Sequence, residues 1–515
     1  MTDVLLGQSY YLRFDPKLLA AQQPYPPLGT LYAASYLRAR GYEVALFDAM
    51  LAESEDEWAA ALDRHQPRYA VLYEDNFNYL SKMCLLRMRE AARRMIDLAK
   101  ARGCTVILCG ADATDHADDY LARGADFVLI GEGEVTLGEL LDRLAMHPAQ
   151  PPAGTRCERN AVQSQDAMQD ILGLVWPGGR TPRRPDITRL DDLPFPAWDL
   201  VDVERYRAIW RQHHGYYSMN MVTTRGCPYH CNWCAKPIWG QRYNSRSPEN
   251  VVAEMKWLKE TYHPDHIGFA DDIFGLKPGW IERFGQRVRE QDAAIPFKCL
   301  SRADLIKPTV VAGLQAAGCR TVWMGAESGS QHILDAMEKG TTVEQIATAR
   351  HLLGVANIEV GYFLQFGYPG ETRADIEATL NLVRTTQPDD IGISVSYPLP
   401  GTKFYERVKA QLGATQNWQS SDDLAMLYHG PYTTAFYRQL HIVVHREFRL
   451  RKGWLAFKHT RRPRLLAATI YRALTLPIVR WRLNRLARIS HPSAAALPVA
   501  LSQQEAAQPT AQSQS

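Results

Sequence analysis

Two long stretches of this 515-residue sequence alternate short apolar runs with amphipathic segments, and this pattern limits the possible folds more than any other feature. Strands that alternate with helices predict a parallel sheet covered by helices on both faces. Residues 1–146 are therefore expected to form a doubly wound, Rossmann-like α/β domain, with ligands beyond the C-terminal strand ends. The apolar runs of this first stretch are 4–6, 44–47, 69–73, 105–109 and 127–130.

The second alternating stretch predicts a partial barrel over residues 213–408. Its six candidate strands begin about 24 to 45 residues apart, which fits strand–helix units. Six units form an incomplete (β/α)6 barrel, and barrel active sites lie at the C-terminal ends of the strands. The candidate strands are 221–224, 266–270, 297–301, 321–324, 360–366 and 391–396.

The remaining segments have other patterns. Residues 147–212 are rich in Pro, Gly, Arg and Gln and are expected to be a linker. Residues 409–489 have a helical pattern and form a C-terminal helical extension. Residues 490–515 are rich in Ala, Gln, Ser and Pro, which predicts a disordered tail.

Composition narrows the class of protein. The chain is 46% hydrophobic and 22% charged, as globular proteins are. A net charge of +3 gives no support for a nucleic-acid partner. No signal peptide and no long apolar run are evident, so a cytoplasmic protein is expected. Nine cysteines are too few for a disulfide scaffold, and clustered cysteines in a reducing compartment indicate metal ligands or catalysts.

Cys227, Cys231 and Cys234 follow a predicted strand with the spacing C-x3-C-x2-C. Thiolates are soft ligands that suit iron–sulfur clusters or zinc. Three thiolates in one loop can hold a 4Fe–4S cluster and leave one iron open to an outside ligand. Zinc would need a fourth ligand, and His230, between two of the cysteines, could reach the same ion only with strain. Three buried structural thiols are the remaining alternative.

The segment from Thr224 to Cys234 resembles the C-x3-C-x-aromatic-C signature of radical S-adenosylmethionine (SAM) enzymes, with Trp233 at the aromatic position. The resemblance implies that SAM binds the open iron through its amino and carboxylate groups. It implies that the reduced cluster cleaves SAM to a 5′-deoxyadenosyl radical. An external electron donor such as flavodoxin or ferredoxin follows from the same resemblance.

Polar residues follow the later strands of the predicted barrel. By residue type alone, they could be a helix N-cap, a structural Arg–Asp pair and a strand-to-helix turn. The resemblance implies that these residues contact SAM instead, and it assigns no residue as catalytic. The expected SAM contacts are Trp233, Asp271, Asp272, Arg302, Glu327, Ser328 and Gly329.

The N-terminal domain resembles the cobalamin-binding domain fused to many radical SAM enzymes, on the segments 25–30, 109–111 and 131–134. The loop after the first strand lacks D-x-H-x-x-G, so no lower histidine ligand to cobalt is expected. A Rossmann-like domain without a cofactor is the alternative. The run 131–134 lacks the Lys and Ser/Thr of a phosphate loop. The expected cobalamin contacts are Pro27, Leu28, Gly29, Gly110, Gly131 and Glu132.

The resemblance covers about residues 1–405 and is similar to the branch that contains the anaerobic magnesium-protoporphyrin monomethyl ester cyclase. It implies an enzyme that functionalises an unactivated carbon of a small, apolar substrate with a 4Fe–4S cluster, SAM and cobalamin. Cobalamin-dependent C-methylation is the main hypothesis. Oxidation, cyclisation or rearrangement without methyl transfer is the alternative. A non-enzymatic module stabilised by zinc or a cluster is a third hypothesis, which the barrel pattern disfavours.

The basic charge is concentrated near the C-terminal end. Residues 451–490 hold eleven Lys and Arg and no Asp or Glu, and over 464–488 the arginines are interleaved with Leu, Ile and Trp. Such a segment can lie on an anionic membrane surface. It could also be a helix docked on the barrel with its arginines in solvent. Contact with nucleic acid is disfavoured because no stacking platform accompanies the charge. Peripheral membrane contact is therefore a hypothesis.

Overall fold

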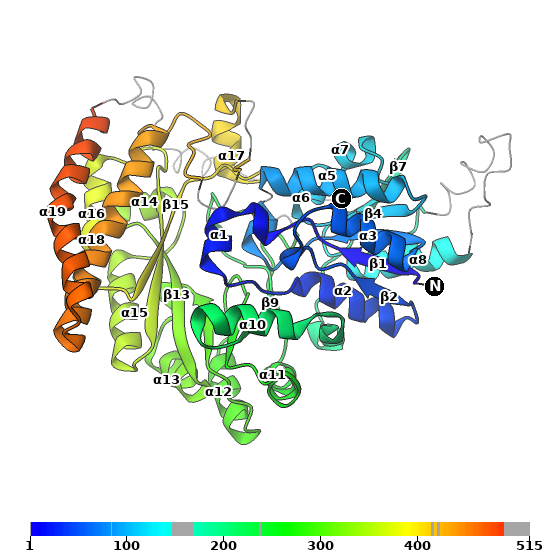
Figure 1. Ribbon diagram of the computed structural model, residues 1–515, viewed down its shortest axis with the longest axis horizontal. Coiled ribbons are helices and arrows are strands. Elements are labelled where there is room, and N and C mark those ends of the chain that lie inside the picture. The colour runs from blue at the N-terminus through cyan, green and yellow to red at the C-terminus, as the bar shows by residue number, and fades with distance from the viewer. Residues whose placement is uncertain are drawn as a thin grey trace, which may run out of the picture.

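The computed structural model describes residues 2–83, 85–146, 168–235, 238–413, 417–419 and 423–488. Two α/β units lie side by side, and a hairpin of two long helices packs against the second unit (Figure 1). The N-terminal unit is at the right of Figure 1 and the helical hairpin at the left. The predicted tail 490–515 lies outside the described residues.

The N-terminal unit contains a seven-stranded sheet in the order β2-β1-β3-β4-β5-β6-β7. Its first five strands are parallel, which confirms the predicted doubly wound domain. They are β1 (Val4–Gly7), β2 (Val44–Leu46), β3 (Tyr69–Tyr73), β4 (Thr105–Cys109) and β5 (Phe127–Leu129). The helices are α1 (Pro16–Ala21), α2 (Leu28–Ala39), α3 (Asp56–His65), α4 (Tyr79–Met83), α5 (Leu86–Lys100), α6 (Ala111–Asp115), α7 (Ala117–Ala122) and α8 (Glu134–Met146).

Each face of this sheet has its own apolar core. Leu37 of α2 and Leu140 of α8 pack against Leu6 on one face. Trp58 of α3 and Met95 of α5 pack in the core of the other face. Because successive strand residues point to opposite faces, strands covered on both sides are apolar throughout. That is why these strands could be predicted as continuous apolar runs.

The segment predicted to be a linker contributes two strands to this sheet. β6 (Leu174–Trp176) pairs antiparallel with β5, and β7 (Gly179–Arg180) pairs antiparallel with β6. The segment also contains helix α10 (Val203–His214). These strands could not be recognised in the sequence, because two or three residues are too few to show a period of two and the surrounding segment is rich in Gly and Pro.

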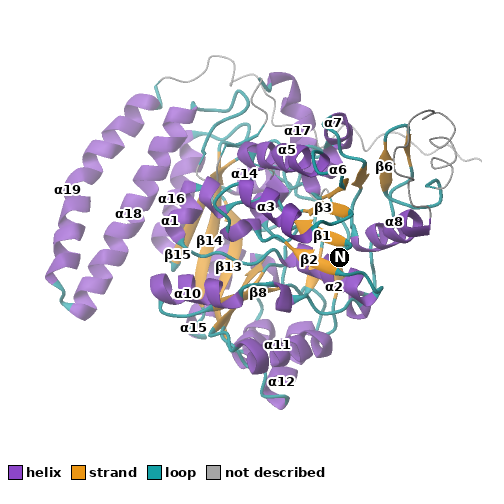
Figure 2. Cartoon of the chain, turned by 45° about the vertical axis from the view of Figure 1, so that its right-hand side comes forward, coloured by secondary structure: helices purple, strands orange, loops and turns teal. Residues whose placement is uncertain are grey.

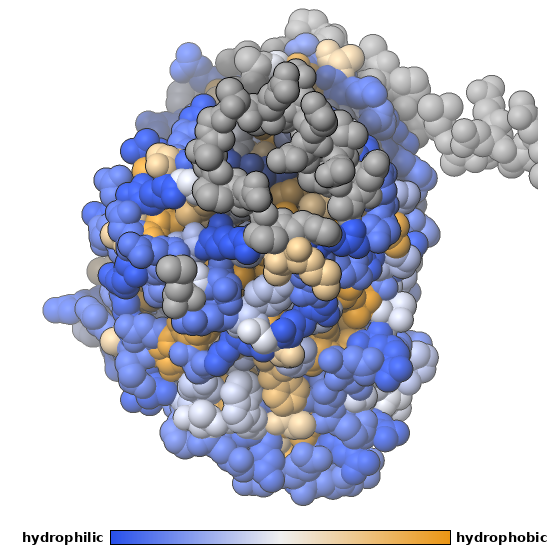
Figure 3. Space-filling model, turned by 90° about the vertical axis from the view of Figure 1, so that its right-hand side faces the viewer, coloured by the Kyte–Doolittle hydropathy of each residue, from blue (hydrophilic) through white to orange (hydrophobic). Residues whose placement is uncertain are grey.

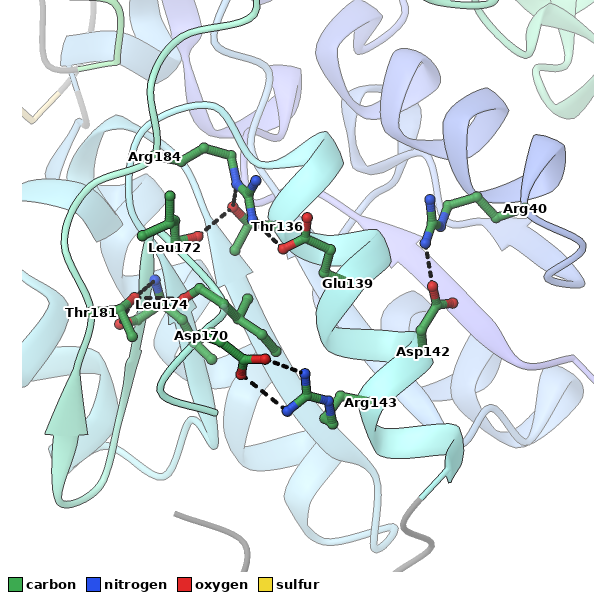
Figure 4. Close-up of polar contacts among 11 residues, drawn as sticks. Arg40, Thr136, Glu139, Asp142, Arg143, Asp170, Leu172, Leu174, Thr181 and Arg184 are labelled. Carbon is green, nitrogen blue, oxygen red and sulfur yellow. Dashed lines mark hydrogen bonds and ion pairs between the residues drawn. The ribbon is translucent and has the colours of Figure 1, made fainter. Parts of the chain in front are cut away.

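Helix α8 holds this added segment in place (Figure 4). The hydroxyl of Thr136 donates to the carbonyl of Leu172 at 2.9 Å, and Arg184 donates to the Thr136 hydroxyl at 2.9 Å. Arg143 forms a two-pronged ion pair with Asp170, at 2.8 and 3.1 Å. The segment 168–184 is thus tied to the N-terminal unit by side chains as well as by the sheet.

The second unit is a six-stranded parallel sheet in the order β15-β14-β13-β12-β11-β8, the predicted partial barrel. Its strands are β8 (Ser218–Met221), β11 (His266–Phe269), β12 (Phe297–Ser301), β13 (Cys319–Glu327), β14 (Glu359–Phe366) and β15 (Asp390–Val395). Its helices are α11 (Pro248–Tyr262), α12 (Trp280–Glu290), α13 (Pro308–Ala317), α14 (Gln331–Ala336), α15 (Val343–Val355), α16 (Arg373–Thr386) and α17 (Lys403–Val408).

The first barrel strand was predicted three residues too late. The structure places it at β8, and Thr224 instead begins β9 (Thr224–Arg225), a short strand that pairs antiparallel with β10 (Asn244–Ser245). Ser218 and Asn220 are polar but buried, because Tyr25 contacts the Ser218 hydroxyl and Asn220 donates to the Pro26 carbonyl. Both partners belong to the N-terminal unit. The search for apolar runs therefore missed the polar start of this strand.

The C-terminal extension is a hairpin of α18 (Thr434–Thr460) and α19 (Pro463–Leu486), which lie side by side in Figures 1 and 2. Phe436, Leu440 and Val443 of α18 are buried in the core of the barrel unit. α19 packs on α18 and continues as a helix through Pro477. Within the described residues, no helix is both long and apolar enough to cross a membrane.

Candidate functional site

The three cysteines lie in the loop that follows β9. None of the three cysteines is in a disulfide, and all three are partly exposed. Gly226, just before Cys227, has a positive φ of 82°. A Cβ atom there would overlap the Arg242 carbonyl oxygen, so the chain can pass this point only with glycine. The sequence therefore begins the loop with a turn that only glycine makes without strain.

Asp271 supports the chain that enters this loop. One of its carboxylate oxygens accepts hydrogen bonds at 2.5–3.0 Å from the backbone amides and hydroxyls of Thr223 and Thr224. The side chain is buried, and burial raises the pKa of Asp271 to about 6. Its described contacts make Asp271 a positioning residue for the loop, whereas a SAM contact stays a prediction. Asp272, next to it, is exposed.

Arg302 supports the loop from the next strand. Its guanidinium stacks on the ring of Tyr229 at 3.6 Å from the centroid and donates to the Cys231 thiol sulfur at 3.8 Å. It also pairs with Asp304 at 3.0 Å and donates to the Lys339 carbonyl at 2.8 Å. Arg302 thus brings a buried positive charge to one of the three thiols. The contact of Arg302 with SAM stays a prediction.

Glu327 ends β13 in the left-handed backbone region, with φ of 58°. A non-glycine residue in this region stores strain, and such strain is concentrated at functional sites. Its buried carboxylate pairs with the ammonium group of Lys339 at 2.9 Å. The opposite charge of Glu327 raises the pKa of Lys339 despite burial, and Cys231 acts in the same direction. Lys339, which sequence reasoning missed, therefore joins Glu327 to the cysteine loop.

Ser328 and Gly329 form the turn from β13 to α14. The Ser328 hydroxyl contacts the Thr379 hydroxyl at 3.0 Å, and the Gly329 amide donates to the same oxygen at 2.9 Å. A Cβ atom at Gly329 would overlap the Ala378 carbonyl oxygen of α16. These contacts give both residues a packing role. Trp233 packs against the apolar cluster of Ile333, Met337, Tyr368, Phe404, Val408 and Tyr428.

Arg225, two residues before Cys227, joins the loop to the N-terminal unit. Its guanidinium pairs with Glu132 at 2.9 Å and with Glu134 at 2.7 Å, and the three side chains are 3–4% exposed. Glu132 also accepts from the Trp239 indole at 2.9 Å. The Arg225 guanidinium lies over the rings of Tyr32 and Phe77. We call Arg225, Glu132 and Glu134 the interdomain clamp.

The predicted cobalamin residues follow β4 and β5 or lie at the start of α2. The Gly29 amide donates to Asp75 at 3.0 Å, and Gly110 lies against the side chain of Glu74. Glu74, the residue after β3, is buried, and burial raises its pKa to about 7. Glu132 belongs to the clamp, and its carboxylate contacts Arg225, the Trp239 indole and the Ile187 amide. Leu28 is buried, Pro27 precedes α2, and Gly131 has a positive φ of 81°.

Tyr79 of the N-terminal unit lies within electrostatic range of the cysteine loop. It begins α4, its side chain is 58% exposed, and it interacts electrostatically with Cys234, Glu327 and Asp272. Neither Tyr79 nor Arg225 stands out in the sequence, because their partners are distant in the chain. The cysteine loop therefore lies near the end of β13 and near an edge of the N-terminal unit.

The parallel half-barrel, the loop of three thiols and the N-terminal sheet define a radical SAM protein with a second, cofactor-binding domain. The family model for the radical SAM superfamily matches residues 221–383, and that for the B12 binding domain matches residues 18–141. The chain belongs to the radical SAM enzymes that carry a B12-binding domain. The first domain implies a 4Fe–4S cluster and SAM, and the second implies cobalamin.

Two curated relatives and one solved structure illustrate this family. An uncharacterized methyltransferase of Pyrococcus horikoshii is 30% identical over 57% of this chain and 60% of the relative. The anaerobic magnesium-protoporphyrin IX monomethyl ester cyclase of Rubrivivax gelatinosus is 24% identical over 75% of this chain and 66% of the relative. The chain therefore spans less than two thirds of either relative.

The solved structure is the radical S-adenosylmethionine methyltransferase TsrM of Kitasatospora setae, with cobalamin and a 4Fe–4S cluster bound. It aligns with a TM-score of 0.63 at 20% identity, over 80% of this chain and 78% of that chain. This likeness shows that the two share a fold. The residues present here fit the implied cluster, because three partly exposed cysteines, none of them in a disulfide, lie in one loop near the cations Arg302 and Lys339.

Proposed function

We propose that this protein is a cobalamin-dependent radical SAM enzyme that methylates an unactivated carbon of a small, apolar substrate. One observation carries the proposal: the clamp ties the cysteine loop directly to the N-terminal unit through two buried ion pairs. Methyl transfer from cobalamin needs both cofactors in one space, whereas radical formation alone needs only the barrel. The name of the Pyrococcus relative agrees with methyl transfer.

Different residues of this chain would hold the cluster, SAM and cobalamin. The thiolates of Cys227, Cys231 and Cys234 would hold the cluster. Arg302 and Lys339 complement the negative charge that three thiolates bring, because opposite charges attract strongly where water is excluded. When bound, the cluster and SAM supply the 5′-deoxyadenosyl radical that removes hydrogen from carbon. The predicted contacts of Asp272 with SAM and of Gly29 and Gly110 with cobalamin belong to this proposal.

The test is anaerobic purification and reconstitution of the full chain with iron, sulfide and hydroxocobalamin, followed by metal analysis. About four irons and one cobalt per chain are expected. Incubation with SAM and a flavodoxin or ferredoxin system should then give 5′-deoxyadenosine and a methylated product. Four irons without cobalt would overturn the methylation proposal while leaving the radical SAM assignment intact.

Oxidation or cyclisation without methyl transfer is the second candidate, and the cyclase relative favours it. The same incubation separates the two. SAM labelled with deuterium in its methyl group places the label in the product only if a methyl group is transferred. A product without label, formed together with 5′-deoxyadenosine, would establish the second candidate.

We also propose that the enzyme works in the cytoplasm against an anionic membrane surface. The outer side of α19 presents a stripe of exposed apolar residues, and α18 and α19 together contain eleven Lys and Arg against one acidic residue, Glu447. Apolar stripes flanked by arginine bind anionic lipid surfaces. In contrast, the face of the N-terminal unit in Figure 3 is mostly hydrophilic. The stripe consists of Ile470, Tyr471, Leu474, Ile478 and Trp481.

Sedimentation with liposomes tests the membrane proposal. Full-length protein should pellet with phosphatidylglycerol vesicles, and the Leu474→Glu, Trp481→Glu double variant should remain in the supernatant. Both residues are more than half exposed, so the variant keeps the core. A matched Val355→Glu variant, at an apolar residue of α15 that is 71% exposed, is a control that should still pellet. Equal pelleting of all three proteins would exclude the stripe as the docking surface.

A further inference from the structure

A cavity of about 600 Å³ lies outside the barrel, between α16 and the hairpin of α18 and α19. This volume is within the range of about 300–1,000 Å³ that is typical of small-molecule pockets. None of its lining residues belongs to the cysteine loop or to the clamp. Its walls are mainly apolar and include Leu380, Val383, Val444, Phe448, Leu466 and Ala473.

Charged residues are gathered at one part of this lining. Arg350, Arg384, Arg451 and Lys452 line the cavity together with only two carboxylates, Asp389 and Glu447. Arg384 and Glu447 form an ion pair with each other. Arg451 donates instead to the carbonyl of Arg384, and Lys452 donates to the carbonyl of Asp389. Carbonyls carry no net charge, so these bonds leave the positive charges of Arg451 and Lys452 to attract an anion.

The cavity opens towards solvent beside the apolar stripe of α19. Trp454, Leu455 and Ile470 line the cavity and are 43–48% exposed. Ile470 belongs to both the lining and the stripe, so the two apolar surfaces are continuous. A molecule could therefore enter from a lipid surface without exposing its apolar part to water, which would be unfavourable.

We propose that this cavity binds a single-chain amphiphile with an anionic head. The apolar walls accept the chain, and Arg451 and Lys452 at the charged part attract the head. A neutral head would leave these cations without a counter-charge, whereas an anion forms charge-assisted hydrogen bonds with them. The site is separate from the cysteine loop, and the inference does not depend on the reaction proposed above.

The probe is cis-parinaric acid, a fluorescent fatty acid whose emission increases in apolar surroundings, titrated into the purified full-length protein. Saturable binding is expected, with displacement by palmitate. Hexadecanol, which has the same chain and a neutral head, should displace it at least about tenfold less effectively. Palmitoyl lysophosphatidate is tested as a second competitor. If it alone displaces the probe, the natural ligand is a lysophospholipid. If palmitate alone displaces the probe, the natural ligand is a free fatty acid. Displacement by neither, or equal displacement by hexadecanol, would overturn the proposal.

Two variants place the site. Ala473→Trp fills the cavity from an exposed position and should abolish parinarate binding. Arg451→Gln with Lys452→Gln should weaken binding of palmitate by about tenfold or more without changing that of hexadecanol. Leu474→Ser is the matched control, because Leu474 is on the stripe and is absent from the lining. Wild-type binding by both the filled and the charge variant would refute the assignment even if parinarate bound elsewhere.

Discussion

The interdomain clamp makes a sharp prediction about stability. Arg225 is 3% exposed, and its two partners are 3% and 4% exposed, at 2.9 and 2.7 Å. Arg225→Met keeps most of the side-chain volume but leaves two buried carboxylates without their cation. Breaking a buried pair by removing one partner costs about 3–5 kcal/mol. We expect a loss of at least that size in the free energy of unfolding, because two carboxylates lose the same cation.

A second variant separates lost charge pairing from lost packing. Arg225→Met combined with Glu132→Gln and Glu134→Gln removes all three charges. Replacement of a whole buried ion network is often close to neutral, so this triple variant should recover much of the loss. The surface pair of Arg38 and Asp199 is the control: both side chains are about half exposed, and Arg38→Met should cost less than about 1 kcal/mol.

The assay is urea unfolding of the full chain, followed by tryptophan fluorescence at pH 7.5. The signal comes from all twelve tryptophans, among them Trp239, which donates to Glu132 of the clamp. A large loss for Arg225→Met with recovery in the triple variant supports the reasoning. If Arg225→Met is no less stable than Arg38→Met, the buried pairs do not hold the two units together and the argument is wrong.

Three further results are expected. Cys231→Ala should lower the iron content and abolish 5′-deoxyadenosine formation, whereas Cys299→Ala, in the core, should retain both; normal turnover by Cys231→Ala would contradict the cluster assignment. Burial raises the pKa of Glu371 from 4.5 to about 8, so the native state keeps a proton that the unfolded state releases between these values. The free energy of unfolding should therefore fall as pH rises from about 4.5 to 8. Glu371→Gln should make the urea denaturation midpoint depend less on pH over this range. An unchanged pH dependence in this variant would exclude Glu371 as its cause. Gly329→Ala should destabilise by about 1–3 kcal/mol, because its Cβ would overlap a carbonyl oxygen of α16, and a melting temperature equal to that of Gly413→Ala, where the space is open, would argue against this contact.

The positions of most strands along the chain could be predicted, because buried parallel strands are apolar on both faces. The exceptions have local causes. β8 carries Ser218 and Asn220, whose partners Tyr25 and Pro26 lie almost 200 residues earlier in the chain. A sequence shows the polar residue but not the distant group that satisfies it. The strand was therefore placed where the next apolar residues occur.

In the candidate site, too, some features could be predicted from the sequence and others could not. Three cysteines close together in sequence must be close together in space, so their spacing alone predicted a shared ligand. The contacts of Glu132 were not predictable, because Arg225 is 93 residues away and belongs to the other unit. Lys339 was missed for a related reason: nothing in its local sequence shows that it meets Glu327. Contacts between distant residues depend on how the units pack, which local patterns do not encode.

The cysteine loop is held from two directions. Asp271 of the barrel binds Thr223 and Thr224, and the next residue, Arg225, is bound by Glu132 and Glu134 of the N-terminal unit. Three consecutive residues are therefore fixed by two separate units, immediately before the turn at which the loop begins. A displacement of the N-terminal unit must strain this segment or break a buried ion pair. The position of the cysteine loop is therefore coupled to the unit that carries the B12-binding domain, and a change at Glu134 should alter the cluster loop without touching any cysteine.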